Sequence, residues 1–547
     1  MTTFTVPRRH TRWHVLAAAS ACLLALSSLA TRASTTAPIV PTESGLVQGM
    51  TQGGVQQFQG MAYAAPPVGT LRWRAPQAPQ TWQGVRPATS IGPSCPQVAT
   101  PYHHTATSED CLYLNVYAPE PTPAQASALR PVMVWIHPGG LAMGAGSDQD
   151  GASLARRTGT VVVTLNHRLG VLGFMSSRET QQESGNANYG LQDQQQALRW
   201  VRANIRAFGG DPGRVTVLGN SAGSFSTCLH LASPASAGLF HRAILQSGPC
   251  IRLGAQTLAQ ARDRADEFAA KVNCPAGAGQ LACLRSLSPD ALIAASPDGL
   301  DTLRVANPWG PVADGTLLPG RVSAAIRDGQ FNRVPVLLGT TADEGRFFVG
   351  YSFHQQAGRV MTEDDYITAA ATMTGSALSG SLSRTLYPTS TYASPDLATA
   401  ALNTDAGFAC PALIDAKRLS RHVPVFAYEF TDTLAPGPSD PFFSWGAYHT
   451  AELQYLFGAP TFITDVTRPM SSGQNALADT MVAYWAAFAA QGDPNGGNRP
   501  SWPRFNELLT PIMNLAPGAI RPQAWGAFQK AHRCTTWSLL FALNGDS

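Results

Sequence analysis

Short runs of consecutive apolar residues, bounded by turn residues, alternate along the chain with longer stretches of helical spacing. Apolar runs of roughly four to eight residues are typical of strands that are buried on both faces of a parallel sheet. Helical spacing is clearest in 191–209 and in the stretch after Ser221. This alternation predicts an α/β fold with a mostly parallel sheet covered by helices on both faces. The expected strands are 132–137, 160–168, 214–220, 241–248, 333–341 and 423–430.

Two regions have a different pattern. Residues 44–64 read as β-hairpin material, and residues 351–440 combine many small and polar residues with helical patches. We expect the second region to form helical insertions over the carboxyl-terminal edge of the sheet, where such folds place their sites. Because no linker, charge run or repeat divides the chain, residues 34–547 are predicted to form a single domain.

The first 33 residues have the composition of a targeting segment. Arg8, Arg9 and Arg12 precede an apolar stretch over 13–30, and small residues at 30 and 33 suit cleavage. The apolar stretch is barely long enough to span a membrane, so residues 1–33 are predicted to be a removed signal peptide. We therefore expect an exported chain, periplasmic or secreted, with no membrane anchor after processing.

The charge balance excludes one class of partner. The first 33 residues hold four of the 38 basic residues and none of the 35 acidic ones, so the rest of the chain is close to neutral. A protein that binds nucleic acid normally carries a clear excess of basic residues. The sequence therefore predicts no nucleic-acid partner.

Nine cysteines are present, of which Cys22 lies in the predicted signal peptide. An even number of cysteines in an exported chain indicates disulfides. The spacings are irregular and contain no C-x-x-C pair, so we expect no zinc site and no other metal.

The segment 215–223, VTVLGNSAG, carries the clearest chemical signal. A β-branched run leads into the motif G-x-S-x-G, in which Gly219 and Gly223 flank Ser221. This pattern predicts a sharp turn between a strand and a helix, with the serine hydroxyl exposed at its apex in a strained conformation. A serine hydroxyl becomes a nucleophile only with a base to take its proton and donors to hold the oxyanion.

The strand over 132–137 ends in His137, Pro138, Gly139 and Gly140. Two glycines allow bare backbone to approach a ligand, and their N–H groups together with that of Ala222 would form a three-donor oxyanion hole. A tight turn after a strand would explain the glycines equally well in isolation. Their occurrence in the same chain as the serine motif favours the oxyanion hole.

The acid and the base of a hydrolase triad are expected to follow the serine in that order. Asp343 and Glu344 come directly after a predicted strand, and His449 lies in a later loop. Chemistry alone does not separate Asp343 from Glu344. The remaining candidate bases are interpreted as buried structural histidines, and they are His137, His167 and His230.

Several longer blocks then indicate a family. Residues 185–223 resemble the nucleophile signature of the type-B carboxylesterase/lipase family, and EDCLYLNVY (109–117) resembles its second signature. Residues 62–76, 167–174, 310–319 and 449–458 resemble further blocks of the same family. The chain is therefore similar, over essentially all of 34–547, to this cholinesterase-like branch of the α/β-hydrolases.

This resemblance implies the α/β-hydrolase fold and hydrolysis of a small carboxylic ester through an acyl-enzyme, with no cofactor. It implies that the triad acid is the glutamate of the DEG turn, and that two polar residues lie behind the base. The implied residues are Ser221, Glu344 and His449 for the triad, Gly139, Gly140 and Ala222 for the oxyanion hole, and Ser247 and Glu452 behind the base.

The resemblance also implies disulfides Cys95–Cys111, Cys274–Cys283 and Cys410–Cys534, whereas Cys228 and Cys250 are either free or bonded to each other. Asn220 departs from the family, in which many members have a glutamate before the nucleophile. The loop between Cys95 and Cys111 contains no tryptophan to bind a quaternary ammonium, which argues against choline esters. Trp309, Phe347 and Phe348 are expected either to line the substrate pocket or to fill the core, and Arg346 either to meet an acidic substrate or to be ion-paired.

The alternatives are a lipase, an amidase or a thioesterase that uses the same site, or a binding homologue without activity. The sequence determines neither the natural ester nor the oligomeric state.

Overall fold

A computed structural model describes residues 37–98, 106–121, 128–185, 187–296, 308–374, 377–458 and 469–543. The predicted signal peptide, 1–33, lies outside the described residues. The strands and helices below all belong to one compact unit, Pro38–Ser547.

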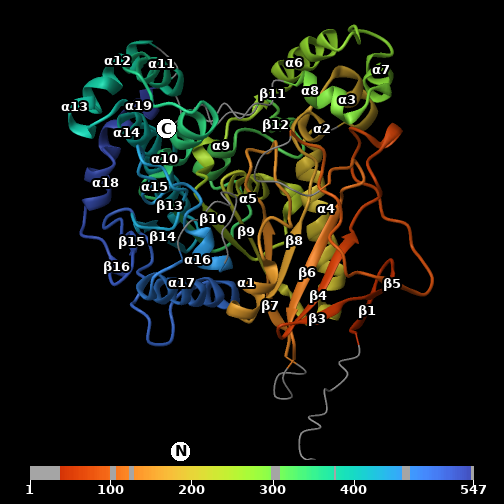
Figure 1. Cartoon of the computed structure of the whole chain (residues 1–547). Helices are drawn as coiled ribbons and strands as arrows, with labels where there is room; N and C mark the ends of the chain where they lie inside the picture. The colour runs from red at the N-terminus through yellow and green to blue at the C-terminus, as the bar shows by residue number, and fades with distance from the viewer. Residues whose placement is uncertain are drawn as a thin grey trace, which may run out of the picture. The chain divides into compact units, whose positions relative to one another are not determined.

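The apolar runs of the sequence lie side by side in one large sheet (Figure 1). Seven successive strands, from β15 to β8 in the spatial order, are parallel, and antiparallel strands complete both edges. In spatial order the strands are β16 (Arg521–Pro522), β15 (Met513–Leu515), β14 (Val425–Phe430), β13 (Val336–Thr341), β10 (Arg242–Gln246), β9 (Gly210–Asn220), β7 (Arg130–Ile136), β8 (Val161–Leu165), β6 (Tyr113–Pro119), β4 (Val55–Ala62) and β3 (Met50–Gln52).

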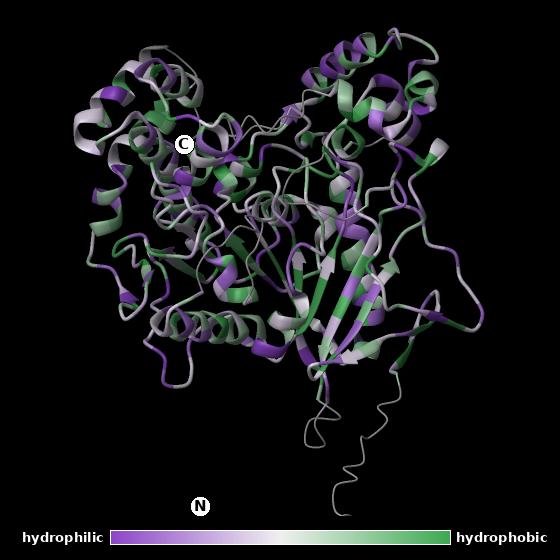
Figure 2. Ribbon diagram, in the orientation of Figure 1, coloured by the Kyte–Doolittle hydropathy of each residue, from purple (hydrophilic) through white to green (hydrophobic). Residues whose placement is uncertain are grey.

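The six predicted strands are confirmed as the central strands, and their burial explains their composition. Every residue of β8 and β13 is buried, so neither strand alternates between apolar and polar positions. Figure 2 shows hydrophobic colouring along strands in the middle of the sheet. The predicted hairpin region is also confirmed, because β2 (Gly45–Gln48) is followed by the antiparallel pair β3 and β4. A smaller sheet joins β1 (Ile39–Thr42), β2 and β5 (Val85–Pro87), and β11 (Gln256–Thr257) pairs with β12 (Val312–Ala313).

Helices cover both faces of the sheet, as predicted. Along β7, Val132 and Val134 belong to one hydrophobic cluster, whereas Met133 and Trp135 belong to another. The first cluster contains residues of α4, α5 and α15, and the second contains residues of α1 and α17. The helices are α1 (Gly151–Thr158), α2 (Gly170–Phe174), α3 (Arg178–Ser184), α4 (Tyr189–Asn204), α5 (Ala222–Ala232), α6 (Leu258–Lys271), α7 (Gln280–Ser286), α8 (Pro289–Ala295), α9 (Val322–Arg327), α10 (Glu344–Val349), α11 (Glu363–Thr374), α12 (Ala377–Leu386), α13 (Thr389–Tyr392), α14 (Pro395–Asn403), α15 (Cys410–Ser420), α16 (Leu453–Phe457), α17 (Ser472–Gln491), α18 (Ala527–Ala531) and α19 (Cys534–Leu543).

The region 351–440 is largely helical, as expected, and contains α11 to α15 before it enters β14. Two π-helical segments interrupt it and its flank, η6 (Gly350–Gln356) and η7 (Thr404–Ala409). The stretch Pro395–Ser420 is long and apolar enough to cross a membrane by composition, but 83% of its most apolar window is buried within the fold. Its apolar composition is therefore accounted for by core packing.

Four disulfides join the cysteines of the described residues. The three pairings implied by the family resemblance are confirmed, namely Cys95–Cys111, Cys274–Cys283 and Cys410–Cys534. Cys228 and Cys250 are bonded to each other, which settles the alternative that the sequence left open.

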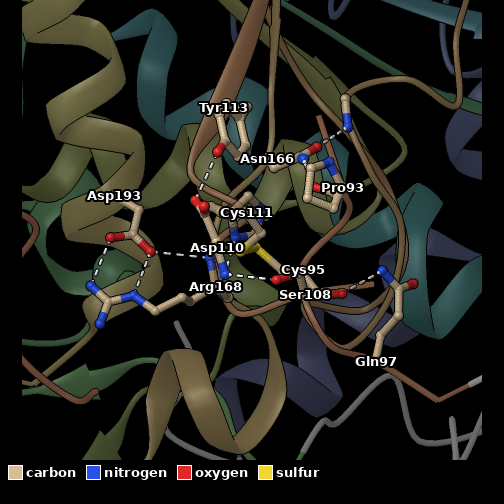
Figure 3. The surroundings of a disulfide bond; sticks show 12 residues. Pro93, Cys95, Gln97, Ser108, Asp110, Cys111, Tyr113, Asn166, Arg168 and Asp193 are labelled. Atoms are coloured by element: carbon tan, nitrogen blue, oxygen red, sulfur yellow. Dashed lines mark hydrogen bonds and ion pairs between the residues drawn. A yellow bond between two sulfur atoms is a disulfide. The ribbon is translucent and has the colours of Figure 1, made fainter. Parts of the chain in front are cut away.

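A buried ion pair joins the end of β8 to α4 (Figure 3). Asp193 accepts hydrogen bonds from the Arg168 backbone N–H at 3.0 Å, from Nε at 2.8 Å and from a terminal guanidinium nitrogen at 2.7 Å. The two side chains are 3% and 0% exposed. Because neither charge reaches water, each depends on the other for its solvation.

We expect Asp193→Asn to lower the free energy of unfolding by about 3–5 kcal/mol, because it leaves the Arg168 charge buried without a counter-ion. Urea unfolding followed by tryptophan fluorescence measures this change. The control is Glu363→Gln, which breaks the Arg384–Glu363 pair, whose side chains are 44% and 45% exposed, and should cost less than about 1 kcal/mol. Equal losses in the two variants would contradict the prediction.

Candidate active site

Ser221 lies at the apex of the turn between β9 and α5, in a backbone conformation that only glycine adopts freely. Its φ and ψ are 55° and −118°, and its N–H donates to Gln246 O at 2.9 Å. A Cβ added at Gly223 would lie 2.0 Å from Ile136 O, and one at Gly219 would lie 2.4 Å from the carbonyl carbon of Gly223. Both flanking glycines are therefore required by close backbone approach, as the motif predicts.

The two glycines after β7 lie beside this turn because Gly223 packs directly on the end of β7. Gly139 and Gly140 have φ values of 118° and 64°. Gly139 O accepts from Ala142 N and Met143 N at 3.0 Å, and a Cβ at Gly139 would meet Met143 O at 2.1 Å. The loop thus folds back tightly on itself, next to the first turn of α5, whose backbone N–H groups carry partial positive charge.

Glu344 and His449 are in direct contact although they lie in distant parts of the chain. His449 Nδ1 and Glu344 Oε2 are 2.5 Å apart, and Glu344 Oε1 accepts from Thr341 N at 2.8 Å. Both side chains are buried. Since a carboxylate only accepts, Nδ1 carries the proton, and no described residue forms a hydrogen bond with Nε2. The other ring nitrogen is therefore available to accept a proton.

Asp343, the other candidate acid, has a different set of partners. Its carboxylate pairs with Arg346 Nε at 3.0 Å and accepts from Ala447 N at 2.9 Å. Arg346 also donates to Ser444 O at 2.9 Å. Arg346 is therefore ion-paired, and Asp343 holds the loop that leads to His449.

A buried side-chain network connects the serine turn to the histidine loop. Asn220 Nδ2 donates to Glu452 Oε1 at 3.0 Å, and Gln246 Nε2 donates to the same oxygen at 3.3 Å. Burial, together with the nearby Glu344 charge, raises the pKa of Glu452 to about 8. Asn220, the residue before Ser221, thus donates a hydrogen bond to Glu452. A glutamate at that position would place a second carboxylate there.

Ser247 is connected to the neighbouring strand through its backbone. It has a φ of 51°, and its N–H donates to Gly339 O at 2.8 Å. Its buried hydroxyl has no hydrogen-bond partner among the described residues. Ser247 therefore lies at the end of β10, bonded to β13, whereas Glu452 makes the side-chain contacts.

Three phenylalanine rings surround the His449 imidazole. The ring centroids of Phe347, Phe348 and Phe408 lie 5.6, 4.9 and 5.1 Å from it. Phe408 was not predicted, because it lies in a region of small and polar residues without a motif. Trp309 is buried, and its ring centroid lies 5.3 Å from that of Phe268. Its indole N–H donates to Ser296 Oγ at 2.7 Å. It shares a hydrophobic cluster with Ala222.

The three other candidate histidines have structural partners, as interpreted from the sequence. His137 and His167 are stacked at 4.8 Å, and burial lowers the pKa of His167 well below its usual value. His230 contacts Ser236 Oγ at 2.9 Å and Gln194 Oε1 at 3.1 Å. Within the described ranges, no group of three or more His, Cys, Asp or Glu side chains is arranged to hold a metal ion.

Comparison with known proteins assigns the chain to a family. Residues 36–537 match the model of the carboxylesterase family. The chain is 36% identical over 491 residues to the para-nitrobenzyl esterase of Bacillus subtilis (strain 168), which covers 86% of this chain and 93% of that protein. It is 35% identical over 490 residues to the fumonisin B1 esterase of Sphingopyxis macrogoltabida, and the match covers 86% of this chain and 85% of that protein. It is 33% identical over 522 residues to carboxylesterase 4A of Bos taurus, and the match covers 86% of this chain and 90% of that protein.

Solved structures give the same result for the fold. A PNB esterase structure superimposes with a TM-score of 0.76 at 33% identity, covering 91% of this chain and 100% of that one. A thermophilic PNB esterase also gives a TM-score of 0.76, at 34% identity with the same coverage. The fold is therefore the α/β-hydrolase fold.

The raised pKa of Glu452 predicts a pH-dependent effect of Glu452→Gln. The folded protein keeps this proton up to about pH 8, whereas an ordinary glutamate loses it near 4.5. The contribution of the Glu452 proton to the free energy of unfolding is therefore fully present below about pH 4.5 and is lost as the pH rises to about 8. Because the amide does not ionise, the variant should gain about 4 kcal/mol relative to wild type between pH 4.5 and 8.5.

Urea unfolding at the two pH values measures this gain. Glu267→Gln, at an exposed position of α6, is the control and should change little with pH. A difference between the Glu452→Gln variant and wild type that is the same at both pH values would show the prediction to be wrong.

Proposed function

The chain belongs to the carboxylesterase family and is a carboxylic ester hydrolase, and from this premise we propose that Ser221, His449 and Glu344 form its catalytic triad. Ser221 is the nucleophile, His449 the general base and Glu344 the residue that orients the imidazole. Gly139, Gly140 and Ala222 supply the oxyanion donors.

In the acylation half, His449 Nε2 takes the proton of Ser221 Oγ as that oxygen attacks the ester carbonyl. The oxyanion that forms accepts hydrogen bonds from the three backbone N–H groups. Glu344 stabilises the imidazolium through the Nδ1 contact. His449 then donates the proton to the alcohol oxygen, the C–O bond breaks, and an acyl-serine remains.

In the deacylation half, water replaces the alcohol. His449 Nε2 takes a proton from the water as its oxygen attacks the acyl carbon. The second oxyanion collapses, the bond to Ser221 Oγ breaks, and the proton returns to that oxygen. The products are a carboxylic acid and the regenerated serine, so the cycle uses no cofactor.

The contact of 2.5 Å between His449 Nδ1 and Glu344 Oε2 carries this proposal. It holds the imidazole in the tautomer whose other nitrogen can act as a base. The hydrogen bond between Asn220 and Glu452 supports it further, because it joins the residue next to Ser221 to the residue three positions after His449.

Phe347, Phe348 and Phe408 support an apolar acyl or alcohol group as the part of the substrate that lies beside the base. A lipase, an amidase or a thioesterase would use the same residues. A binding homologue without activity would require that Ser221 be inert. No observation in the structure favours any of these four.

We also propose that the protein is exported and acts in the periplasm or outside the cell, with the signal peptide 1–33 removed. The four disulfides support this location, because disulfides persist in oxidising compartments.

Replacement of the nucleophile should abolish turnover. For Ser221→Ala we expect kcat on p-nitrophenyl acetate to fall by at least about 10⁴-fold, with an unchanged unfolding temperature, because no hydroxyl remains to form the acyl-enzyme. Ser226→Ala, on the same helix, should retain most of the activity. Labelling with a fluorophosphonate should modify Ser221 in the wild type, as located by peptide mass analysis. Wild-type turnover in Ser221→Ala would exclude the mechanism.

A series of esters tests the apolar pocket. We expect kcat/KM to rise roughly fourfold per added methylene from p-nitrophenyl acetate to butyrate, because each buried CH₂ contributes about 0.8 kcal/mol. p-Nitrobenzyl acetate, the matching p-nitroanilide and a thioester complete the panel. A rate that does not change with acyl length would contradict the apolar pocket. Faster cleavage of the anilide or thioester, or a jump in rate on emulsified ester, would select one of the other hydrolase readings.

A further inference from the structure

The π-helical segment η7, Thr404–Ala409, touches the segments of both proposed partners of Ser221. Thr404 Oγ1 accepts from Gly345 N at 2.9 Å, and Gly345 directly follows Glu344. Four residues further, the Phe408 ring lies 5.1 Å from the His449 ring and is stacked on Phe348 at 5.5 Å. η7 therefore contacts both the backbone next to Glu344 and the ring of His449.

A buried carboxylate anchors η7 on its other side. Asp405 Oδ1 accepts from His532 Nδ1 at 2.6 Å, and Asp405 Oδ2 accepts from the Tyr387 hydroxyl at 2.6 Å. The Arg533 guanidinium lies 3.7 Å from the same oxygen. Asp405 and His532 are 3% and 6% exposed. The carboxylate of the π-helix is thus bonded to the chain segment between α18 and α19.

His532 bridges two carboxylates from different elements. Its Nε2 donates to Glu429 Oε1, on the central strand β14, at 2.6 Å. Because both carboxylates only accept, both ring nitrogens carry protons and the ring is an imidazolium. Burial alone would lower the pKa of His532, but the hydrogen bonds and charges of Asp405 and Glu429 outweigh burial and raise it to about 10. The bridge is therefore charged at neutral pH.

A disulfide connects the same two regions. Cys410, the residue after η7, is bonded to Cys534, two residues after His532. Removing the imidazole consequently leaves the C-terminal segment attached, whereas the bond between η7 and the rigid strand β14 through His532 is lost.

We propose that His532 is a positioning residue for catalysis. Its imidazolium, held between Asp405 and Glu429, fixes η7 so that Thr404 and Phe408 keep Glu344 and His449 in their productive contact. This inference rests on the proposed triad. His532 itself contacts neither the substrate nor the reacting atoms.

The test compares His532→Gln with wild type at pH 7.5. A glutamine is uncharged and has both donor hydrogens on one nitrogen, so it cannot replace the imidazolium between the two carboxylates. We therefore expect kcat on p-nitrophenyl butyrate to fall roughly tenfold to a hundredfold, as is usual when a catalytic group is slightly misplaced. KM should stay within about twofold, because the substrate pocket keeps its side chains. The low-field proton resonance of His449 Nδ1–H should broaden or shift in the variant.

Two further variants separate positioning from general stability. Thr404→Val removes the hydroxyl that accepts from Gly345 N and changes the shape of the side chain little. It should lower kcat, as His532→Gln does. Val161→Ala, at the first residue of β8 and within the core, is the control: it should lower the unfolding temperature and leave kcat and the low-field resonance unchanged.

Wild-type kcat and resonance in a folded His532→Gln variant would overturn the inference. If that variant does not fold, wild-type kcat in Thr404→Val would overturn it. If Val161→Ala loses as much kcat as His532→Gln, the loss is explained by lower stability alone, and this result would also overturn the inference. The proposed triad is judged separately, by Ser221→Ala, so that failure of one does not imply failure of the other.

Discussion

The buried contact between Glu344 and His449 is the interaction on which the site depends. A carboxylate away from water is costly unless its oxygens are hydrogen-bonded. Here one oxygen accepts the Thr341 N–H and the other faces His449 Nδ1. The rings of Phe348 and Phe408 pack against the imidazole and offer no competing hydrogen-bond acceptor. The carboxylate and the imidazole therefore fix one another, and the surrounding segments serve to keep them together.

Close backbone approach provides the second constraint. Gly223 rests on the end of β7 at a separation that no side chain allows, and this contact brings the loop with Gly139 and Gly140 beside the serine turn. Buried hydrogen bonds to Glu452 then connect the ends of β9 and β10 with the loop of His449. Neighbouring parallel strands end at one edge, so groups that are far apart in sequence meet there.

Much of the fold and part of the site could be predicted from the sequence. The central strands were recognisable because burial on both faces leaves uninterrupted apolar runs, and the serine turn because its geometry excludes all residues but glycine at two positions. The choice between Asp343 and Glu344 was not accessible to residue chemistry, since both are carboxylates after the same strand. Phe408 was missed because packing on an imidazole imposes no motif, only a ring of suitable size.

The sequence by itself determined the strand and helix pattern, the strained serine turn and the types of residue that the chemistry needs. These properties depend on local sterics and on periodic burial, and both can be recognised from residues that are close together in the sequence. Only the tertiary structure decided which carboxylate meets His449, that Cys228 and Cys250 are joined, and that His532 lies between Asp405 and Glu429. Each of these contacts joins different elements of the fold, so its geometry depends on how whole elements pack rather than on any neighbouring residue.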